Sequence, residues 1–254
     1  MERSLKEHFE QTLQEVSIDC AIFGFHAGEL KILLLRWKGT DGWSLPGGRI
    51  YKEESTDDAA NRILKERTGL TDIFLQQYYT FGNANRLTHL SKQDLMELLE
   101  LALGKDYFHD KINRRVVSIG YFALVEFDQV QATADWYTDE FRWWEIPDVP
   151  KLLFDHNEMV VRALHALRQQ IRNQPVGYNL LPEKFTMPEL QRLYETILDK
   201  QFDRRNFQKL LVSYDILEKL DEKRTGGANK SPFLYRFNKS KYEKAMIDGV
   251  SFAM

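Results

Sequence analysis

The segment GGRIYKEESTDDAANRILKERTGL, residues 47–70, holds the side chains whose types and spacing are best suited to chemistry. Two of its glutamates are candidates, Glu54 just before a predicted helix and Glu66 near its end, because carboxylate oxygens are the ligands that Mg²⁺ prefers. A bound Mg²⁺ would act as a Lewis acid and activate water. Arg67 stands next to Glu66, however, and its guanidinium would repel a metal ion. The segment therefore suits either metal-dependent hydrolysis or the binding of a small ligand without turnover.

The helix that carries these side chains is predicted over residues 55–68. Ser55 or Thr56 can cap its first turn, two aspartates suit its positive N-terminal end, and Gly69 ends it. Ile63 and Leu64 lie on the face that we expect to pack on a sheet, and the paired glycines before the helix make a turn.

This segment resembles the Nudix box, whose pattern is G-x5-E-x7-R-E-U-x-E-E-x-G-U, with U an apolar residue. The matching positions are Gly48, Glu54, Arg62, Leu64, Glu66, Gly69 and Leu70. Two glutamates of the pattern are replaced, by Ile63 and Arg67. The resemblance implies a Nudix-like fold over about residues 15–170, and the replacements lead us to expect no catalytic residue, no bound metal and no cofactor. Glu66 has a second open role, because it stands four residues after Arg62 and can pair with it along the helix.

A Nudix-like domain without hydrolysis still has a preformed cavity, which we expect to bind a small effector. The candidate ligand-binding residues are Arg49, Glu54, Glu66, Arg67, Asn83, Asn85 and Arg115, with Arg86 beside them. Trp43, Trp143 and Trp144 could offer a flat face to a sugar ring or to adenine, although each is better explained as a core or strand residue. The cations suit the diphosphate of ADP-ribose and the carboxylates and amides suit a neutral sugar, so the residues leave both effectors open.

Composition and charge narrow the class of protein. The 254 residues are 43% hydrophobic and 29% charged, a globular mixture long enough for one large or two modest domains. The apolar stretches are far shorter than the ~20 residues of a membrane span and no signal peptide is evident, so we expect a cytoplasmic protein without a membrane partner. Cys20 is the single cysteine, which excludes an intrachain disulfide and a cysteine-based zinc cluster.

The net charge of −3 is unevenly distributed along the chain. The part up to Arg172 has a net charge of −6 (21 Lys+Arg against 27 Asp+Glu), and the part from Asn173 has +3 (14 against 11). This difference suggests two units with different partners.

Apolar and alternating patterns predict the elements around the box. Strands are predicted over residues 16–26, 30–38, 74–81, 115–127 and 141–146, a Pro-Gly-Gly turn at 46–48, and a helix over 155–172. A leucine-rich helix is predicted as an insertion at about residues 88–106, and we expect it to pack on its own domain rather than to bind a partner. Residues 173–185 lack periodicity and contain several turn residues, so a domain boundary is predicted between residues 174 and 175.

Beyond this boundary the pattern is helix, helix and basic hairpin, which is the order of a winged helix-turn-helix. Thr186 and Glu189 form the capping-box pattern of the first helix, and Asp203 caps a second helix predicted over residues 204–220. The second helix begins with hydrogen-bond donors that suit bases and phosphates, and the hairpin adds cations. The candidate DNA-binding residues are Arg204, Arg205, Asn206, Gln208, Lys209, Lys223, Arg224 and Lys230. The stretch Asp203–Ser240 holds nine Lys+Arg against five Asp+Glu, a net of +4 that suits DNA.

The pairing of the Nudix-like part with this C-terminal half resembles the Nudix-related transcriptional regulators of the NrtR family. The segment FDHNEMVVRAL, residues 154–164, is similar to their sugar-responsive, arabinose-regulator branch. The resemblance implies a homodimer that binds double-stranded operator DNA under the control of ADP-ribose or a sugar, with a pentose favoured as the effector.

The expected fold class is α+β. It combines a Nudix-like α/β/α sandwich with a mixed sheet over residues 1–174 and a winged helix-turn-helix domain over residues 175–254. Two other interpretations stay open: a Mg²⁺-dependent Nudix hydrolase of ADP-ribose or a related nucleoside diphosphate, and a protein–protein module that binds neither DNA nor a small ligand.

Overall fold

The structure is a computed structural model that describes residues 10–71, 73–87, 91–103, 115–131, 137–172, 174, 177–178, 180–224 and 231–248. The described residues divide into two compact units. The first unit takes the chain up to Phe23, then Lys31–Leu124 and Gln129–Ala163; the second takes Gly24–Leu30, Val125–Asp128 and the chain from Leu164 onward. No described helix is long and apolar enough to span a membrane.

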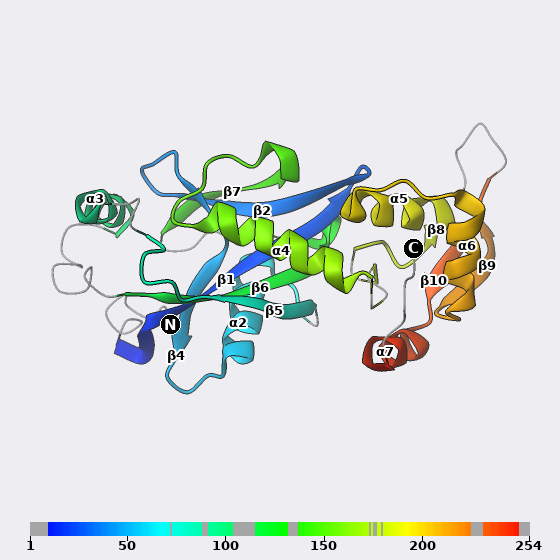
Figure 1. The fold of residues 1–254 in the computed structure, drawn as a ribbon, viewed down its shortest axis with the longest axis horizontal. Helices are drawn as coiled ribbons and strands as arrows, with labels where there is room; N and C mark the ends of the chain where they lie inside the picture. Colours follow the sequence, from blue (N-terminus) through cyan, green and yellow to red (C-terminus); the bar gives the residue numbers. More distant parts are fainter. Residues whose placement is uncertain are drawn as a thin grey trace. The chain divides into compact units, whose positions relative to one another are not determined.

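Figure 1 shows the strands and helices of the described residues in chain order. The elements are β1 (Thr12–His26), β2 (Glu29–Trp37), β3 (Trp43–Ser44), β4 (Gly47–Tyr51), α2 (Thr56–Thr68), β5 (Phe74–Phe81), α3 (Lys92–Leu103), β6 (Val117–Glu126), η2 (Phe127–Gln129), β7 (Thr138–Glu145), η3 (Ile146–Asp148), α4 (His156–Gln170), β8 (Phe185–Thr186), α5 (Met187–Leu198), α6 (Arg204–Ser213), β9 (Leu217–Lys223), β10 (Phe233–Phe237) and α7 (Lys239–Asp248). The architecture is α+β in both units, as predicted.

The first unit is built on a sheet of seven strands among the described residues. Five of them run in the order β3-β2-β1-β6-β5, with β4 paired to β1 and β7 paired to β2. The central strand β1 is buried from Ile18 to Phe23, because its apolar side chains are covered on both faces of the sheet.

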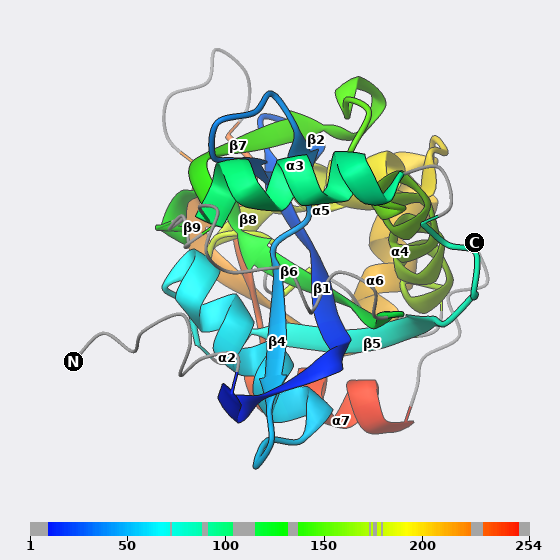
Figure 2. The same cartoon turned by 90° about the vertical axis from the view of Figure 1, so that its left-hand side faces the viewer.

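Helices α2 and α4 cover opposite faces of this sheet (Figure 2). The side chains of β6 alternate between the faces. Tyr121 points to α2, where its hydroxyl donates to Asp57 Oδ1 at 2.5 Å. Phe122, on the other face, packs against Tyr78, whose hydroxyl donates to the carbonyl of Met159 on α4 at 3.0 Å. The two hydroxyl contacts therefore attach α2 and α4 to opposite faces of the sheet.

The predicted turn at residues 46–48 is wrong from Gly47 onward. Gly47 begins strand β4, which pairs antiparallel with β1 so that Asp19 lies opposite Gly47. A Cβ atom at Gly47 would collide with the Asp19 carboxylate and lie 2.8 Å from the carbonyl oxygen of Ile18. The glycine is needed because two strands approach each other closely, a role that local turn statistics do not reveal.

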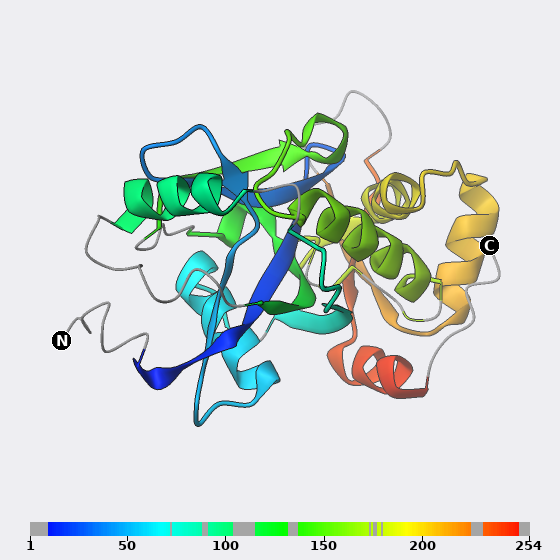
Figure 3. The ribbon, with the colours of Figure 1, turned by 60° about the vertical axis from the view of Figure 1, so that its left-hand side comes forward.

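The predicted insertion contains helix α3, and its residues 88–90 and 104–106 lie outside the described residues. Leu98 of α3 packs with Trp37 in a small apolar cluster that also includes Leu153 and Phe154. Helix α3 lies beside the loop that follows β2 in two views (Figures 2 and 3), where Gly39 meets Leu101. The described part of the helix thus packs on its own domain.

The second unit holds an antiparallel sheet in the order β8-β10-β9, next to α5 and α6 (Figure 1). Helix α5 begins at the predicted capping box of Thr186 and Glu189. Helix α6 begins at the predicted cap Asp203, whose carboxylate accepts two backbone N–H bonds. The aromatic rings of Tyr194 and Phe207 meet edge to face at 5.5 Å and join the two helices.

Two features of this unit differ from the prediction. Helix α6 ends at Ser213 instead of residue 220, because Asp215 takes a left-handed φ of 57° and Leu217–Lys223 pairs with β10 as β9. A further helix, α7, follows the hairpin at Lys239–Asp248, where no helix was predicted. At the end of α6, strand pairing with β10 outweighs local helix propensity.

Candidate functional site

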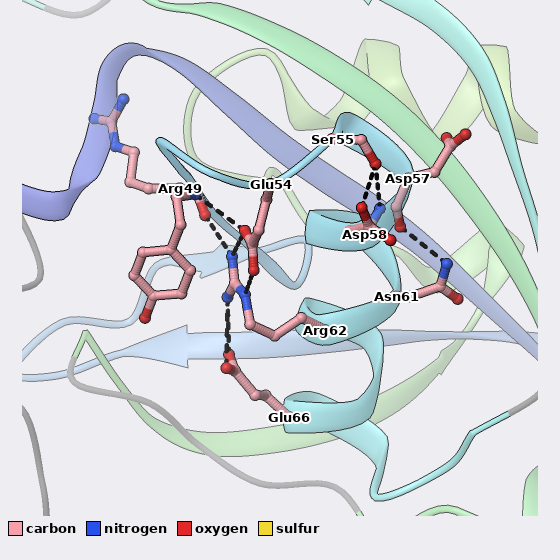
Figure 4. Close-up of polar contacts among 9 residues, drawn as sticks. Arg49, Glu54, Ser55, Asp57, Asp58, Asn61, Arg62 and Glu66 are labelled. Carbon is pink, nitrogen blue, oxygen red and sulfur yellow. Dashed lines mark hydrogen bonds and ion pairs between the residues drawn. The ribbon is translucent and has the colours of Figure 1, made fainter.

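Arg62 organises the loop and helix of the box segment (Figure 4). Its guanidinium donates to both oxygens of Glu54, at 2.6 and 2.8 Å, and to the backbone carbonyl of Arg49 at 2.8 Å. It also lies over the ring of Tyr51, 4.3 Å from the centroid, and the backbone N–H of Tyr51 donates to Glu54 at 3.0 Å. One arginine of α2 therefore ties the end of β4 and the loop after it, residues 49–54, to the helix.

The two glutamates of the segment have different environments. Partial burial raises the pKa of Glu54, but the hydrogen bonds and charge of Arg62 lower this pKa by a larger amount. The net shift is therefore downward. The Arg62 pKa moves the opposite way: burial lowers it and the pairing with Glu54 raises it above its usual value. Glu66 is more exposed, at 45%, and meets Arg62 at 3.4 Å, which is the i,i+4 pairing considered from the sequence. Glu54 thus holds the loop, whereas Glu66 faces solvent.

The two replaced positions of the Nudix pattern, Ile63 and Arg67, are four residues apart and lie on the same side of α2. Ile63 is fully buried and packs against Gly48, where a Cβ atom would come within 3.0 Å of Ile63 Cδ1. Arg67 is partly exposed. Burial, and after it the charge of Asp19, raise the pKa of Cys20 well above its usual value, and the positive charge of Arg67 opposes this shift. In the described ranges, no three His, Cys, Asp or Glu side chains gather as a metal site would require.

A buried polar cluster beside the box was not found from the sequence. Asp19 lies on β1, and its carboxylate accepts hydrogen bonds from the hydroxyls of Ser118 and Ser17. His156 Nε2 lies 3.6 Å from Asp19 Oδ1, while His156 Nδ1 accepts the N–H of Leu45 at 3.0 Å. Burial lowers the His156 pKa, so the ring is neutral with its proton on Nε2. One signal was present: an aspartate inside the apolar run of residues 18–23.

The candidate residues of the loop after β5 gather around Gly82. Asn83 accepts the backbone N–H of Asn85 at 2.9 Å, and Arg115 donates to the carbonyl of Gly82. Arg86 is buried against Asp155, with two hydrogen bonds at 2.6 and 2.8 Å. Asn83, Asn85 and Arg115 are exposed and accessible to a ligand, while Arg86 has a structural partner.

Two of the candidate tryptophans meet. The rings of Trp43 and Trp144 pack edge to face at 5.6 Å, and the guanidinium of Arg142 lies 5.9 and 5.3 Å from the two ring centroids. Trp143 is adjacent to Trp144 on β7, so it points to the other face of the sheet. The structure therefore brings together two of the three aromatic side chains and places a cation on them.

Helix α6 presents a polar outer face. Phe207 and Leu211 are buried and anchor the helix on its unit. The side chains of all the predicted DNA-contacting positions on this helix are exposed: Arg204, Arg205, Asn206, Gln208 and Lys209. The first three follow the Asp203 cap directly, so they belong to the first turn, where backbone N–H groups and the helix dipole favour anions.

The cations of the hairpin differ in their partners. Lys223 is exposed, with its ammonium 4.8 Å from the centroid of the Phe233 ring. Arg224 is paired with Glu189 of α5, whose two carboxylate oxygens it contacts at 2.8 and 2.7 Å. Lys230 lies outside the described residues.

Family comparisons divide the chain into two recognisable parts. Residues 14–164 match the NUDIX domain family, and residues 177–237 match the NrtR DNA-binding winged helix domain. The predicted boundary between residues 174 and 175 falls in the interval between the two matches and stays a prediction.

Similar proteins match the chain over nearly its whole length. A protein of Acinetobacter baylyi, the ADPR responsive transcriptional repressor NtrR, is 27% identical over 235 residues, which are 90% of this chain and 84% of the relative. The crystal structure of Shewanella oneidensis NrtR in complex with a 27mer DNA has a TM-score of 0.71 at 26% identity, covering 91% of this chain and 96% of that one. A MutT/nudix family protein of Enterococcus faecalis shares the fold, with a TM-score of 0.63 at 21% identity over 93% of this chain and 94% of that one.

Proposed function

We propose, on the premise that this chain belongs to the NrtR family of Nudix-domain proteins with a C-terminal winged helix, that it is a DNA-binding transcriptional repressor controlled by ADP-ribose. The full-length similarity to the ADPR responsive repressor of Acinetobacter baylyi supports both parts of the proposal. The likeness to Shewanella oneidensis NrtR, solved with DNA, supports the DNA-binding part.

The observation that carries the proposal is the exposed first half of α6. Arg204, Arg205 and Asn206 stand in its first turn with free approach from solvent, while Phe207 holds the helix on its unit. Arginine can contact guanine with two hydrogen bonds, and asparagine can do the same with adenine. A helix built in this way can enter the major groove with its N-terminal residues against the bases.

We also propose that the Nudix domain senses its ligand without hydrolysing it. The residues do not fit the magnesium site of a Nudix hydrolase. Glu54 already accepts hydrogen bonds from Arg62 on both oxygens, Ile63 is apolar and buried, and Arg67 is a cation where the pattern has a carboxylate. A divalent cation needs several oxygen ligands, and Glu66 alone offers too few.

Hydrolysis is tested by incubating the protein with ADP-ribose and Mg²⁺ and measuring release of AMP. We expect no turnover by the natural chain. The double variant Ile63→Glu with Arg67→Glu restores the pattern, and magnesium-dependent turnover by it would support a decayed catalytic site. Turnover by the natural chain at a comparable rate would overturn the sensor proposal in favour of the hydrolase.

ADP-ribose is the effector that we favour because the similar repressor responds to it. Arg49 and Arg67, both partly exposed, supply cations near the box for a diphosphate, and burial lowers the Arg49 pKa. The pentose suggested by the arabinose-regulator resemblance has no support among the matched proteins named above. Arabinose therefore enters the experiment as the competing effector.

The central experiment is a titration of a labelled duplex, taken from immediately upstream of the chain's own gene, with and without ADP-ribose, arabinose or xylose. Allosteric coupling in proteins is typically ~1–3 kcal/mol, so we expect ADP-ribose to change the operator affinity by about 5- to 150-fold. An effect of arabinose alone would replace ADP-ribose by a pentose. No binding even at low salt would reject the DNA-binding proposal, because phosphate contacts are strongest there.

Arg205→Ala tests the recognition helix directly. If Arg205 contacts a base, its loss weakens specific binding by about 1–3 kcal/mol and relaxes the preference at that base pair. Lys244→Ala, which removes an exposed cation from α7, is the matched control and should leave specificity unchanged.

We infer in addition that the protein acts in the cytoplasm as a homodimer, which is what the NrtR resemblance implies. Light scattering of the purified chain, alone and with the duplex, measures the oligomeric state.

A further inference from the structure

The base of the β9–β10 hairpin is tied to the N-terminus of α5 by a single carboxylate, that of Glu189. One of its oxygens accepts the backbone N–H of Thr186 at 2.7 Å and the Thr186 hydroxyl at 2.9 Å. Both oxygens meet Nη2 of Arg224, at 2.8 and 2.7 Å. The same side chain therefore completes the cap of α5 and holds the arginine that follows β9.

These contacts close a ring of interactions within the second unit. Thr186 belongs to β8 and pairs with Leu234 of β10. Strand β10 pairs in turn with β9, with Phe233 opposite Lys223. Arg224 follows β9, donates its backbone N–H to the carbonyl of Pro232 at 3.0 Å, and returns through its side chain to Glu189. Helix α5 and the hairpin are thus joined twice, once through β8 and once through the Glu189–Arg224 pair.

The charge state of Glu189 is set by this ring. Partial burial raises its pKa, but the hydrogen bonds from Thr186 and Arg224 lower it by more, so the carboxylate is ionised at neutral pH. Helix α5 also packs on α6 through Tyr194 and Phe207. A link between α5 and the hairpin consequently fixes the hairpin relative to the recognition helix, since both are attached to the same helix.

We propose that Glu189 is a positioning residue for DNA binding: it holds Arg224, and with it the base of the hairpin, in the place that lets the hairpin and α6 contact one duplex together. This inference rests on the proposed DNA-binding function. It assigns Arg224 to the internal link, although the sequence pattern grouped it with the residues that contact DNA.

The proposal makes a prediction whose sign is opposite to that of simple electrostatics. DNA is a dense polyanion, so the removal of an acidic charge from a DNA-binding domain is expected to strengthen binding. If Glu189 positions the hairpin, its neutralisation weakens binding instead. Glu189→Gln is the suitable variant because glutamine still serves in a capping box, which preserves the start of α5 while the ion pair with Arg224 is lost.

The matched control is Glu222→Gln. Glu222 lies on β9 of the same hairpin and pairs with Lys184 at 2.8 Å, outside the ring formed by Glu189 and Arg224. Both variants remove one negative charge from the same unit. A partly exposed ion pair is worth ~0.2–1 kcal/mol, so we expect Glu189→Gln to weaken binding to the upstream duplex by about 1.4- to fivefold, with Glu222→Gln equal to the natural chain or tighter.

Salt dependence separates the two roles of Arg224. An arginine that contacts a phosphate contributes about one to the slope of log affinity against log salt. We expect Arg224→Ala to weaken binding with the slope unchanged. A slope reduced by about one, or a Glu189→Gln variant that binds as tightly as the natural chain or more tightly, would overturn the proposal.

Hydrogen exchange provides a second readout that needs no DNA. Glu189→Gln should speed exchange at the backbone amide of Arg224 and along β9, while Glu222→Gln should leave the Arg224 amide protected. Unchanged exchange in the Glu189 variant would also overturn the inference. If the natural chain fails to bind any upstream duplex, the proposed function fails, and the exchange experiment still decides whether Glu189 holds the hairpin.

Discussion

Replacement of Arg62 by methionine should destabilise the first unit by more than is usual for a residue that is partly accessible to solvent. The variant loses two hydrogen bonds to Glu54, one to the carbonyl of Arg49 and the contact with the Tyr51 ring. Hydrogen bonds to charged groups contribute ~1.5–3 kcal/mol each when buried. Because about a fifth of each side chain stays exposed, 21% for Arg62 and 19% for Glu54, the sum is reduced, and we expect a loss of about 3 kcal/mol in the free energy of unfolding.

Tryptophan fluorescence during urea unfolding is a selective assay for this change. All five tryptophans of the chain lie before residue 145, so the signal reports on the first unit alone. Glu54→Gln and the double variant complete a mutant cycle, for which we expect a coupling energy of about 1–2 kcal/mol because the two side chains are in direct contact.

Arg162→Met is the control. Arg162 also pairs with a glutamate, Glu158, and also lies 4.3 Å from the centroid of a tyrosine ring, but its side chain is 43% exposed. Exposed i,i+4 pairs of this kind contribute only ~0.3–0.5 kcal/mol. If Arg62→Met were no more destabilising than Arg162→Met, the structural role of Arg62 would be refuted. Glu54 would then be available for another role, such as binding a cation.

Other perturbations test the surrounding scaffold. Arg86→Met leaves Asp155 as an uncompensated buried charge and should lower stability by about 3–5 kcal/mol, measured in the same urea assay; a loss below ~1 kcal/mol would contradict the buried pairing. Burial lowers the His156 pKa in the folded chain. Below pH ~6.5, the usual histidine pKa, the unfolded chain therefore binds a proton at this ring that the folded chain does not bind. Stability should therefore fall as the pH drops from 7 to 5, and an equal slope in His156→Asn would argue against this assignment. Leu98→Ala removes a 9% exposed side chain from the cluster with Trp37 and should cost about 2–3 kcal/mol, whereas Leu101→Ala, at 59% exposure, should cost less than ~1 kcal/mol in the same thermal or urea melt.

Local elements of the fold were predictable because their causes lie within a few residues. Ser55, Thr186 and Asp203 cap their helices as expected, since an N-cap depends on backbone groups two or three positions away. Gly69 ends α2 with a left-handed φ of 73°. Elements that depend on distant partners were predicted less well: β4 at Gly47 and the early end of α6 both follow from strand pairing.

The spacing of residues selected candidates for the site, but it could not predict their contacts. The spacing of the box identified Glu54 and Glu66, and the residues of α6 that we expect to meet DNA are exposed as predicted. Which of the two glutamates holds the loop could not be read from spacing, because it depends on which carboxylate Arg62 reaches in the folded loop.

The amino-acid sequence by itself determined the two-part organisation, the Nudix pattern and the helix caps. Each of these depends on residues that lie close together along the chain. Only the tertiary structure decided how Asp19 and Glu189 are used. Asp19 on β1 meets His156 of α4, far along the chain, and Glu189 of α5 meets Arg224, which follows β9. Charged and polar side chains are short-range partners in space, and their pairing is set by which strands and helices the fold brings within hydrogen-bond distance.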